Sequence, residues 1–251
     1  MSTDPTERFT HRVDDYIRYR PLYPPAVLGV LEGCGLTAEW VIADVGCGPG
    51  NLTRLLLDNG NPVYGVEPNQ PMREAGARLL AGYARFTSIA GTAEATTLAD
   101  GSVRLVTAAQ AFHWFDARRA RQEFTRILRP PGWVALIWNE RRPDSTPFLA
   151  GYDRLAREYA IADVGRRTTG QTLALQEFFG PGGYSVTALE NSQQFDLEGL
   201  RGRLLSSSYA PVAGQPGHAA LLDALGALFE RHQEQGRVTL EYDTRVYLGC
   251  L

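Results

Sequence analysis

The stretch Trp40–Leu57, WVIADVGCGPGNLTRLLL, decides the fold of this 251-residue chain. It begins with a short apolar run, Val41–Ala43, of the type that forms a strand buried on both faces. Asp44 follows at the strand end, and a turn with three glycines comes next. Leucines then recur at helical spacing, so we expect a helix whose first turn is capped by Asn51 or Thr53. Strand, glycine turn and helix in this order open a nucleotide-binding α/β sheet.

The glycine turn, Gly46–Gly50, predicts a ligand site. Glycine lets the backbone turn sharply and lets a ligand approach closely, and the next helix points its unpaired N–H groups toward the turn. The spacing G-x-G-x-G differs from the dinucleotide pattern G-x-G-x-x-G, and the lysine and hydroxyl of a phosphate-binding loop are missing. We therefore predict a nucleoside-type ligand, with a purely structural turn as the alternative.

A second strand, Val63–Val66, ends at Glu67. One βαβ unit brings two such strand ends side by side, so this carboxylate is expected next to the glycine turn. It could accept hydrogen bonds from both hydroxyls of a ribose, or it could be a surface acid that caps the helix beginning near Asn69. The nearby glycine turn favours the ribose. Pro68 and Met72 would offer an apolar face to an adenine ring, although Met72 could equally be a core residue.

The segment after the fourth expected strand, Val103–Ala109, predicts a second part of the site. Gln110 comes first, and the aromatic run Phe112–Phe115 surrounds His113. Such aromatic residues are costly to expose, so they line either the core or a pocket. Because ligands bind at the carboxyl ends of strands in open α/β sheets, we consider His113 a candidate catalytic or substrate-contacting residue, with a structural role as the alternative.

The first 25 residues combine aromatic and basic side chains. Tyr16, Tyr19 and Arg20 lie close together, and prolines at 21, 24 and 25 end any helix there. This arm either packs over the domain or forms a lid whose aromatic and arginine side chains face the ligand.

Composition limits the function classes. With 44% hydrophobic and 21% charged residues, the chain is typical of a globular protein with a sizeable core. The net charge of -3 argues against a general nucleic-acid or membrane surface. Neither the three cysteines nor the four histidines have metal-ligand spacing, so we expect no metal. No apolar run approaches the length of a membrane span, and the polar N-terminus does not resemble a signal peptide. We expect a cytoplasmic enzyme; the sequence carries no sign of its oligomeric state.

Four motifs resemble those of class I S-adenosylmethionine-dependent methyltransferases. The acid and glycine loop of residues 44–50 is similar to that family's acid-x-G-x-G-x-G pattern, and ILRPPGW at 127–133 is near its L-K-P-G-G turn. The leader at 16–24 and AFHWF at 111–115 resemble a small-molecule subgroup that includes trans-aconitate-type carboxyl methyltransferases. The family usually carries an acid at the position of Thr92, where this chain departs from the pattern.

The resemblance implies a fold and a cofactor. The fold is a doubly wound, Rossmann-like α/β sheet of seven mostly parallel strands with one antiparallel strand, plus helical cap insertions. The cofactor is S-adenosylmethionine. Its expected contacts are Tyr16, Arg20, Asp44, Gly46, Cys47, Gly48, Gly50, Asn51, Glu67, Pro68, Met72, Thr92, Ala93, Glu94 and Gln110.

We expect one domain over residues 1–251, with a lid arm at 1–25 and a cofactor-binding core at 26–140. Cap insertions are expected at 141–183 and 196–236, and the last strands at 184–195 and 237–248. Gly236 would lead into the final strand, whose long alternating pattern predicts antiparallel pairing. Further expected elements are strands at 85–90 and 133–138 and helices at 25–34, 117–128, 148–158, 173–179, 197–206 and 219–235.

Methyl transfer from a sulfonium is an in-line displacement, in which the protein mainly aligns the two partners and excludes water. His113 could take a proton from a hydroxyl, phenol or amine acceptor, whereas a carboxylate would need no base and could be clamped by Arg20, Arg141 or Arg142. Tyr19, Trp114, Arg141 and Arg142 are the expected contacts to a small-molecule acceptor. The alternative functions are an NAD(P)-dependent oxidoreductase and a non-catalytic S-adenosylmethionine-binding regulator.

Overall fold

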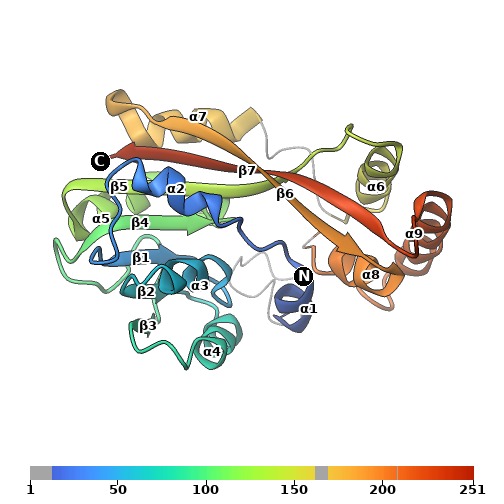
Figure 1. Ribbon diagram of the computed structural model, residues 1–251, viewed down its shortest axis with the longest axis horizontal. Helices are drawn as coiled ribbons and strands as arrows, with labels where there is room; N and C mark the ends of the chain where they lie inside the picture. Colours follow the sequence, from blue (N-terminus) through green and yellow to red (C-terminus); the bar gives the residue numbers. More distant parts are fainter. Residues whose placement is uncertain (1–12, 162–168, 208) are drawn as a thin grey trace.

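The computed structural model describes residues 13–161, 169–207 and 209–251. Within these ranges the strands form a single sheet in the order β3-β2-β1-β4-β5-β7-β6 (Figure 1). The strand β7 runs antiparallel to both of its neighbours, and the first five strands pair in parallel. The predicted doubly wound sheet with one antiparallel strand is therefore confirmed. The strands are β1 Ile42–Val45, β2 Val63–Val66, β3 Phe86–Ile89, β4 Val103–Ala109, β5 Leu128–Arg141, β6 Ser185–Phe195 and β7 Val238–Cys250.

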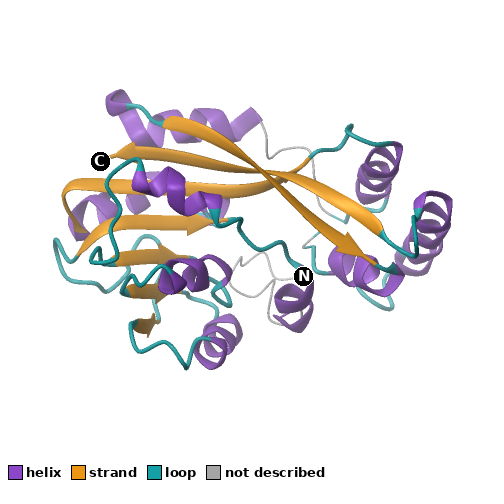
Figure 2. Cartoon of the chain, viewed as in Figure 1, coloured by secondary structure: helices purple, strands orange, loops and turns teal. Residues whose placement is uncertain are grey.

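Helices connect the strands and cover the sheet (Figure 2). Short polar side chains begin several of them: Asn69 accepts a hydrogen bond from the Met72 N–H, and Asp116 accepts one from the Arg119 N–H. The helices are α1 Val13–Tyr19, α2 Ala26–Glu32, α3 Asn51–Asp58, α4 Gln70–Leu79, α5 Ala117–Ile127, α6 Pro147–Glu158, α7 Thr169–Phe179, α8 Leu197–Leu205 and α9 His218–His232, with short 3-10 turns at Phe112–Trp114 and Gly180–Gly182.

Neighbouring residues of the central strands face opposite layers, as a pleated strand requires. In β1, Ala43 belongs to the apolar cluster that contains α5 and α7, and Ile42 belongs to the cluster that contains α2 and α3. Both side chains are fully buried. This explains why the apolar residues of β1 do not alternate with exposed polar ones, although the strand includes the buried Asp44.

The strands β6 and β7 extend beyond the parallel part of the sheet, and α6, α8 and α9 gather around their far half (Figure 1). A third apolar cluster joins these helices to β7 through residues such as Tyr152, Leu204, Leu225 and Tyr242. We call α6, α8 and α9 with this part of β7 the cap. No helix in the part of the chain that the structure describes is long and apolar enough to cross a membrane.

The expectation that the whole insertion at 141–183 joins the cap was wrong for α7. The Phe178 ring packs edge-on against Phe112 and Phe124, with ring centroids 5.0 and 5.9 Å apart. Phe178 and Phe179 are both 1% exposed. The two aromatic side chains at the end of α7 are therefore buried under the sheet beside α5.

Candidate active site

The turn between β1 and α3 is left-handed at each of its three glycines, with φ of 68° at Gly46, 56° at Gly48 and 95° at Gly50. A Cβ on Gly46 would lie 2.6 Å from the Ala111 Cβ, and one on Gly50 would lie 2.6 Å from the Leu80 side chain. A Cβ on Gly48 would meet nothing within 4 Å. The outer glycines are therefore needed for backbone conformation and packing, and the middle one leaves space above the turn.

Asp44 lies beneath this turn and is 1% exposed. Its carboxylate accepts hydrogen bonds from the hydroxyls of Thr53, at 2.6 Å, and Thr107, at 2.8 Å. Burial raises the pKa of Asp44 to about 6, although these two bonds oppose the shift. Asp44 thus ties β1 to α3 and β4 instead of lining a cavity. The expected cap by Asn51 or Thr53 was wrong, because Gly50 occupies the N-cap position without a side-chain bond and the Thr53 hydroxyl is used by Asp44.

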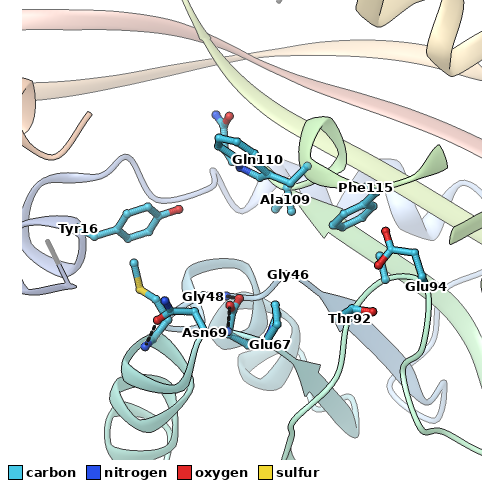
Figure 3. A pocket seen from close by; sticks show the side chains of 15 residues that line it. Tyr16, Gly46, Gly48, Glu67, Asn69, Thr92, Glu94, Ala109, Gln110 and Phe115 are labelled. Atoms are coloured by element: carbon cyan, nitrogen blue, oxygen red, sulfur yellow. Dashed lines mark hydrogen bonds between the residues drawn. The ribbon is translucent and has the colours of Figure 1, made fainter. Parts of the chain in front are cut away.

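Glu67 is held at the end of β2 by two backbone groups. Its Oε2 accepts a hydrogen bond from the Gly48 N–H at 2.8 Å, and its Oε1 accepts one from the Asn69 N–H at 2.9 Å. Burial raises the pKa of this carboxyl, and the two N–H bonds partly oppose that rise. Each oxygen keeps acceptor capacity for a further donor, so Glu67 presents a fixed acceptor pair beside the turn (Figure 3).

A cavity of about 830 Å³, counting its open mouth, lies over the carboxyl ends of β1, β2 and β4. We call it the cofactor cavity. The ring of Tyr16 enters from one side, opposite Thr92, Glu94 and Phe115 (Figure 3). Ten of the predicted cofactor residues line it: Tyr16, Gly46, Gly48, Glu67, Pro68, Met72, Thr92, Ala93, Glu94 and Gln110.

Five predicted cofactor residues do not line this cavity. Besides Asp44, the Cys47 thiol is turned toward β2, where its sulfur would lie 3.1 Å from a Cβ on Gly65. Gly50 packs against Leu80. The remaining two, Arg20 and Asn51, line a second cavity.

Sequence reasoning missed four residues of the cofactor cavity: Asn69, Ala109, Ala111 and Phe115. Asn69 was considered only as the beginning of a helix, yet it also donates its backbone N–H to Glu67. Phe115 lies in the aromatic run that the sequence had already marked. Its ring packs edge-on against Phe112, with centroids 6.0 Å apart, and this contact turns it toward the cavity.

The second cavity adjoins the first, and Tyr16 and Gln110 line both. We call it the acceptor chamber because two of the predicted catalytic and acceptor residues, His113 and Arg141, line it; it encloses about 1350 Å³, counting its opening. Gln110 has a φ of 55°, which is uncommon outside glycine, and its side chain donates to the Asn139 carbonyl at 3.0 Å. The chamber is also lined by Arg20, Pro21, Tyr23, Asn51, His113, Trp138, Asn139, Glu140, Arg141, Pro143, Asp153, Arg157, Arg203, Ser207 and Tyr209.

The residues predicted to act in catalysis or to contact the acceptor lie in different parts of the structure. His113 and Arg141 line the chamber, with His113 exposed to solvent. Trp114 lines the cofactor cavity instead, because the turn at Phe112–Trp114 sends it to the other side. The other two predicted acceptor contacts, Tyr19 and Arg142, lie outside the lining of both cavities. The ring of Tyr19 packs on Gly202 of α8, and Arg142 lies at the partly exposed far side of β5, where it pairs with Asp243 at 2.7 Å.

Among the chamber residues that sequence reasoning missed are Arg203 and Tyr209. The Tyr209 hydroxyl accepts a hydrogen bond from Arg141 at 2.8 Å. Burial alone would raise the pKa of this phenol, but the charges of Arg141 and Arg203 outweigh burial and lower it to about 8. No local motif marks either residue, because both reach the chamber through the packing of the cap.

Known proteins share the cofactor half of this architecture. A family model described as a methyltransferase domain matches residues 43–136. An uncharacterized methyltransferase of Geobacillus kaustophilus is 34% identical over 170 residues, which cover 65% of this chain and 78% of the relative. The chain belongs to this methyltransferase family. The family match begins in β1 and ends in β5, so it contains the glycine turn, Glu67 and Gln110.

Two further comparisons bear on the extent of the family resemblance. An uncharacterized methyltransferase of Mycobacterium tuberculosis is 39% identical over 133 residues, so the match spans about half of each chain, 53% of this one and 52% of the relative. A solved structure from Anaeromyxobacter dehalogenans, classed with type II methyltransferases, has a TM-score of 0.72 at 24% identity and covers 92% of this chain and 98% of its own. The methyltransferase fold therefore includes the cap, whereas the closer sequence similarity to the mycobacterial protein covers only half of the chain.

Proposed function

We propose that this protein transfers a methyl group from S-adenosylmethionine to a small-molecule acceptor. The observation that carries the proposal is the Glu67 carboxylate, fixed by the Gly48 and Asn69 N–H groups at the edge of the open glycine turn. A carboxylate in this position would accept hydrogen bonds from the two ribose hydroxyls. The space beside Gly48 leaves room for the sugar.

The rest of the cofactor cavity fits an adenosyl group. Pro68, Met72 and Phe115 supply apolar walls for an adenine ring, and Thr92 and Glu94 supply polar atoms at its rim. Tyr16 and Gln110 stand between this cavity and the chamber, where the methyl-bearing end of the cofactor would lie.

In the proposed mechanism, S-adenosylmethionine supplies a methyl group that its sulfonium already activates, so the protein needs no nucleophile of its own. Tyr16 and Gln110 would orient the two partners in line, and the arm with the cap would keep water away from them. His113 would accept the proton of a hydroxyl, phenol or amine acceptor. A carboxylate acceptor would require no base, and the chamber arginines would hold it.

We also propose that the arm acts as a lid and that the cap forms the acceptor wall. Residues 1–12 of the arm lie outside the described residues. The remainder supports the lid, because α1 brings Tyr16 to the cofactor cavity and Arg20 to the chamber.

The proposed function is tested by binding and turnover with the same protein. Calorimetry should detect 1:1 binding of S-adenosylhomocysteine and no binding of NAD. Incubation with S-adenosylmethionine and a panel of acids, phenols and amines should yield a methylated product and S-adenosylhomocysteine, both detected by mass spectrometry. Binding without turnover over the whole panel would favour a regulatory protein, and tight binding of NAD would favour an oxidoreductase.

The role of His113 is tested with His113→Ala and His113→Gln. If His113 is a base, kcat should fall in both variants while the affinity for S-adenosylhomocysteine is unchanged. An unchanged kcat in both variants would exclude this role.

A further inference from the structure

The acceptor chamber is lined by more positive than negative side chains. Four arginines line it, Arg20, Arg141, Arg157 and Arg203, against the two carboxylates of Glu140 and Asp153. Both carboxylates are already engaged. Asp153 pairs with Arg141 at 3.3 Å and with Arg157 at 2.6 Å, and Glu140 pairs with Arg245 outside the chamber at 2.9 Å.

Arg203 is buried without a carboxylate partner among the residues that the structure describes. It is 4% exposed. Its guanidinium donates to two neutral oxygens, the Tyr242 hydroxyl at 3.2 Å and the Ser207 hydroxyl at 3.2 Å. A buried charge costs free energy unless an opposite charge or hydrogen bonds compensate for it, and the described partners of Arg203 are neutral oxygens.

Arg20 is partly buried and also has no carboxylate partner among the described residues. Its guanidinium donates a hydrogen bond to the Ser206 carbonyl at 2.7 Å, and its charge lies 5.0 Å from the centre of the Tyr16 ring. Its Nε is buried and has no hydrogen-bond partner within the described ranges. Burial and the charge of Arg203 lower the pKa of Arg20 to about 10, which indicates that the two guanidinium groups share one positive region.

We propose that Arg20 and Arg203 together hold a carboxylate or phosphate group of the methyl acceptor. The proposal rests on the proposed function for the identity of the ligand as an acceptor. A sulfonium at the boundary of the chamber would add a third positive charge, so an anionic acceptor would reduce the net positive charge there. The anionic group holds the acceptor in the chamber. The atom that is methylated is the nucleophile of the bound acceptor that lies in line with the methyl group.

Anion titrations of the full protein, loaded with saturating S-adenosylhomocysteine, test this anchor without knowledge of the natural acceptor. The probes are inorganic phosphate, acetate, succinate and benzoate, with succinamide and benzamide as uncharged controls, and binding is measured by calorimetry. We expect at least one anion to bind saturably and neither amide to bind. An absence of saturable binding by all four anions would overturn the proposal.

Substitutions then locate the anchor. Arg20→Gln and Arg203→Gln should each weaken binding of that anion by about tenfold or more, because a charge-assisted bidentate contact is lost. Arg203→Lys keeps the charge and should retain part of the affinity, and thermal unfolding of each variant shows whether it is folded. The matched control is Arg201→Gln, an exposed arginine two positions away on α8, which should bind like the unsubstituted protein. Equal losses in Arg201→Gln and Arg203→Gln would contradict the anchor.

The methionine carboxylate of the cofactor is the other source of such an anion. Titrations with S-adenosylhomocysteine and with methylthioadenosine, which lacks the amino-acid part, distinguish the two sources. If the anion belongs to the acceptor, Arg203→Gln leaves both affinities unchanged. If Arg20→Gln and Arg203→Gln weaken S-adenosylhomocysteine alone and leave anion binding intact, the cofactor supplies the carboxylate and the acceptor anchor is refuted. Failure of the unsubstituted protein to bind S-adenosylhomocysteine would instead count against the proposed function.

Discussion

The cofactor cavity and the acceptor chamber share Tyr16 and Gln110 but contain buried charge of opposite sign. Beside the glycine turn the buried charged groups are the carboxylates of Asp44 and Glu67, and both are hydrogen-bonded. In the chamber the buried charged group is Arg203, and it has only neutral hydrogen-bond partners among the described residues. The first region thus presents a fixed acceptor of hydrogen bonds, whereas the second presents a buried cation whose described partners are neutral.

Glu67→Ala should give the largest loss of affinity for S-adenosylhomocysteine, and it tests the role proposed for the cofactor cavity. Each charge-assisted hydrogen bond contributes about 1.5–3 kcal/mol, so loss of two should weaken binding of S-adenosylhomocysteine by roughly 100-fold or more. Glu74→Ala, on the exposed face of α4, is the control and should bind normally. Calorimetry measures both, and an unchanged affinity in Glu67→Ala would remove the ribose contact.

Asp44→Asn tests whether the carboxylate beneath the turn reduces stability. Burial raises the pKa of Asp44 to about 6 from 3.8, so the folded state holds the proton more tightly than the unfolded state does. Protonation of Asp44 therefore stabilises the folded state, and this stabilisation is lost as pH rises through 6. The variant does not titrate, so at pH 8 it should be more stable than the unsubstituted protein by up to about 3 kcal/mol. Urea unfolding should show this difference shrinking toward zero near pH 4. A stability difference between the two proteins that is the same at pH 4 and pH 8 would contradict the raised pKa of Asp44.

Gly202→Ala tests the link between the cap and the arm. A Cβ at this position of α8 would collide with the Tyr19 ring of α1, so α1 must move, and with it Tyr16. Overpacking costs about 1–3 kcal/mol, and the better helix propensity of alanine offsets roughly 1 kcal/mol of it. We expect a net destabilisation of about 1 kcal/mol in urea unfolding and weaker binding of S-adenosylhomocysteine.

The control for that variant is Gly226→Ala in α9, where a Cβ would make only an ordinary contact. It should be stabilised by up to about 1 kcal/mol and should bind normally. Equal behaviour of the two alanine variants would show that α1 does not depend on α8.

Arg142→Gln should change turnover and ligand affinity least, and it tests whether the acceptor chamber ends before Arg142. Its guanidinium pairs with Asp243 and Glu190 at the surface and does not line the chamber. Turnover and S-adenosylhomocysteine affinity should both be unchanged in steady-state assays and calorimetry. A clear rise in the KM for the acceptor would restore the original prediction that Arg142 contacts it.

The same division explains what could be predicted from the sequence. The glycine turn, Glu67 and Gln110 follow directly after strands whose apolar patterns are plain, so their meeting place follows from the parallel order of the sheet. The length of β5 and the position of α7 were harder to predict from the sequence. The strand β5 is long because it pairs with β7, which lies more than a hundred positions away in the sequence. Arg203 could not be predicted, because α8 shows neither a strong apolar stripe nor a motif, and only the packing of the cap brings it beside Arg20.

A crystal structure of the protein with S-adenosylhomocysteine tests the central claim most directly. We predict the ribose hydroxyls on the Glu67 carboxylate, the adenine between Met72 and Phe115, and the sulfur beside Tyr16 and Gln110, facing the chamber. An adenosyl group bound elsewhere, with Glu67 still bonded only to the Gly48 and Asn69 N–H groups, would contradict the account.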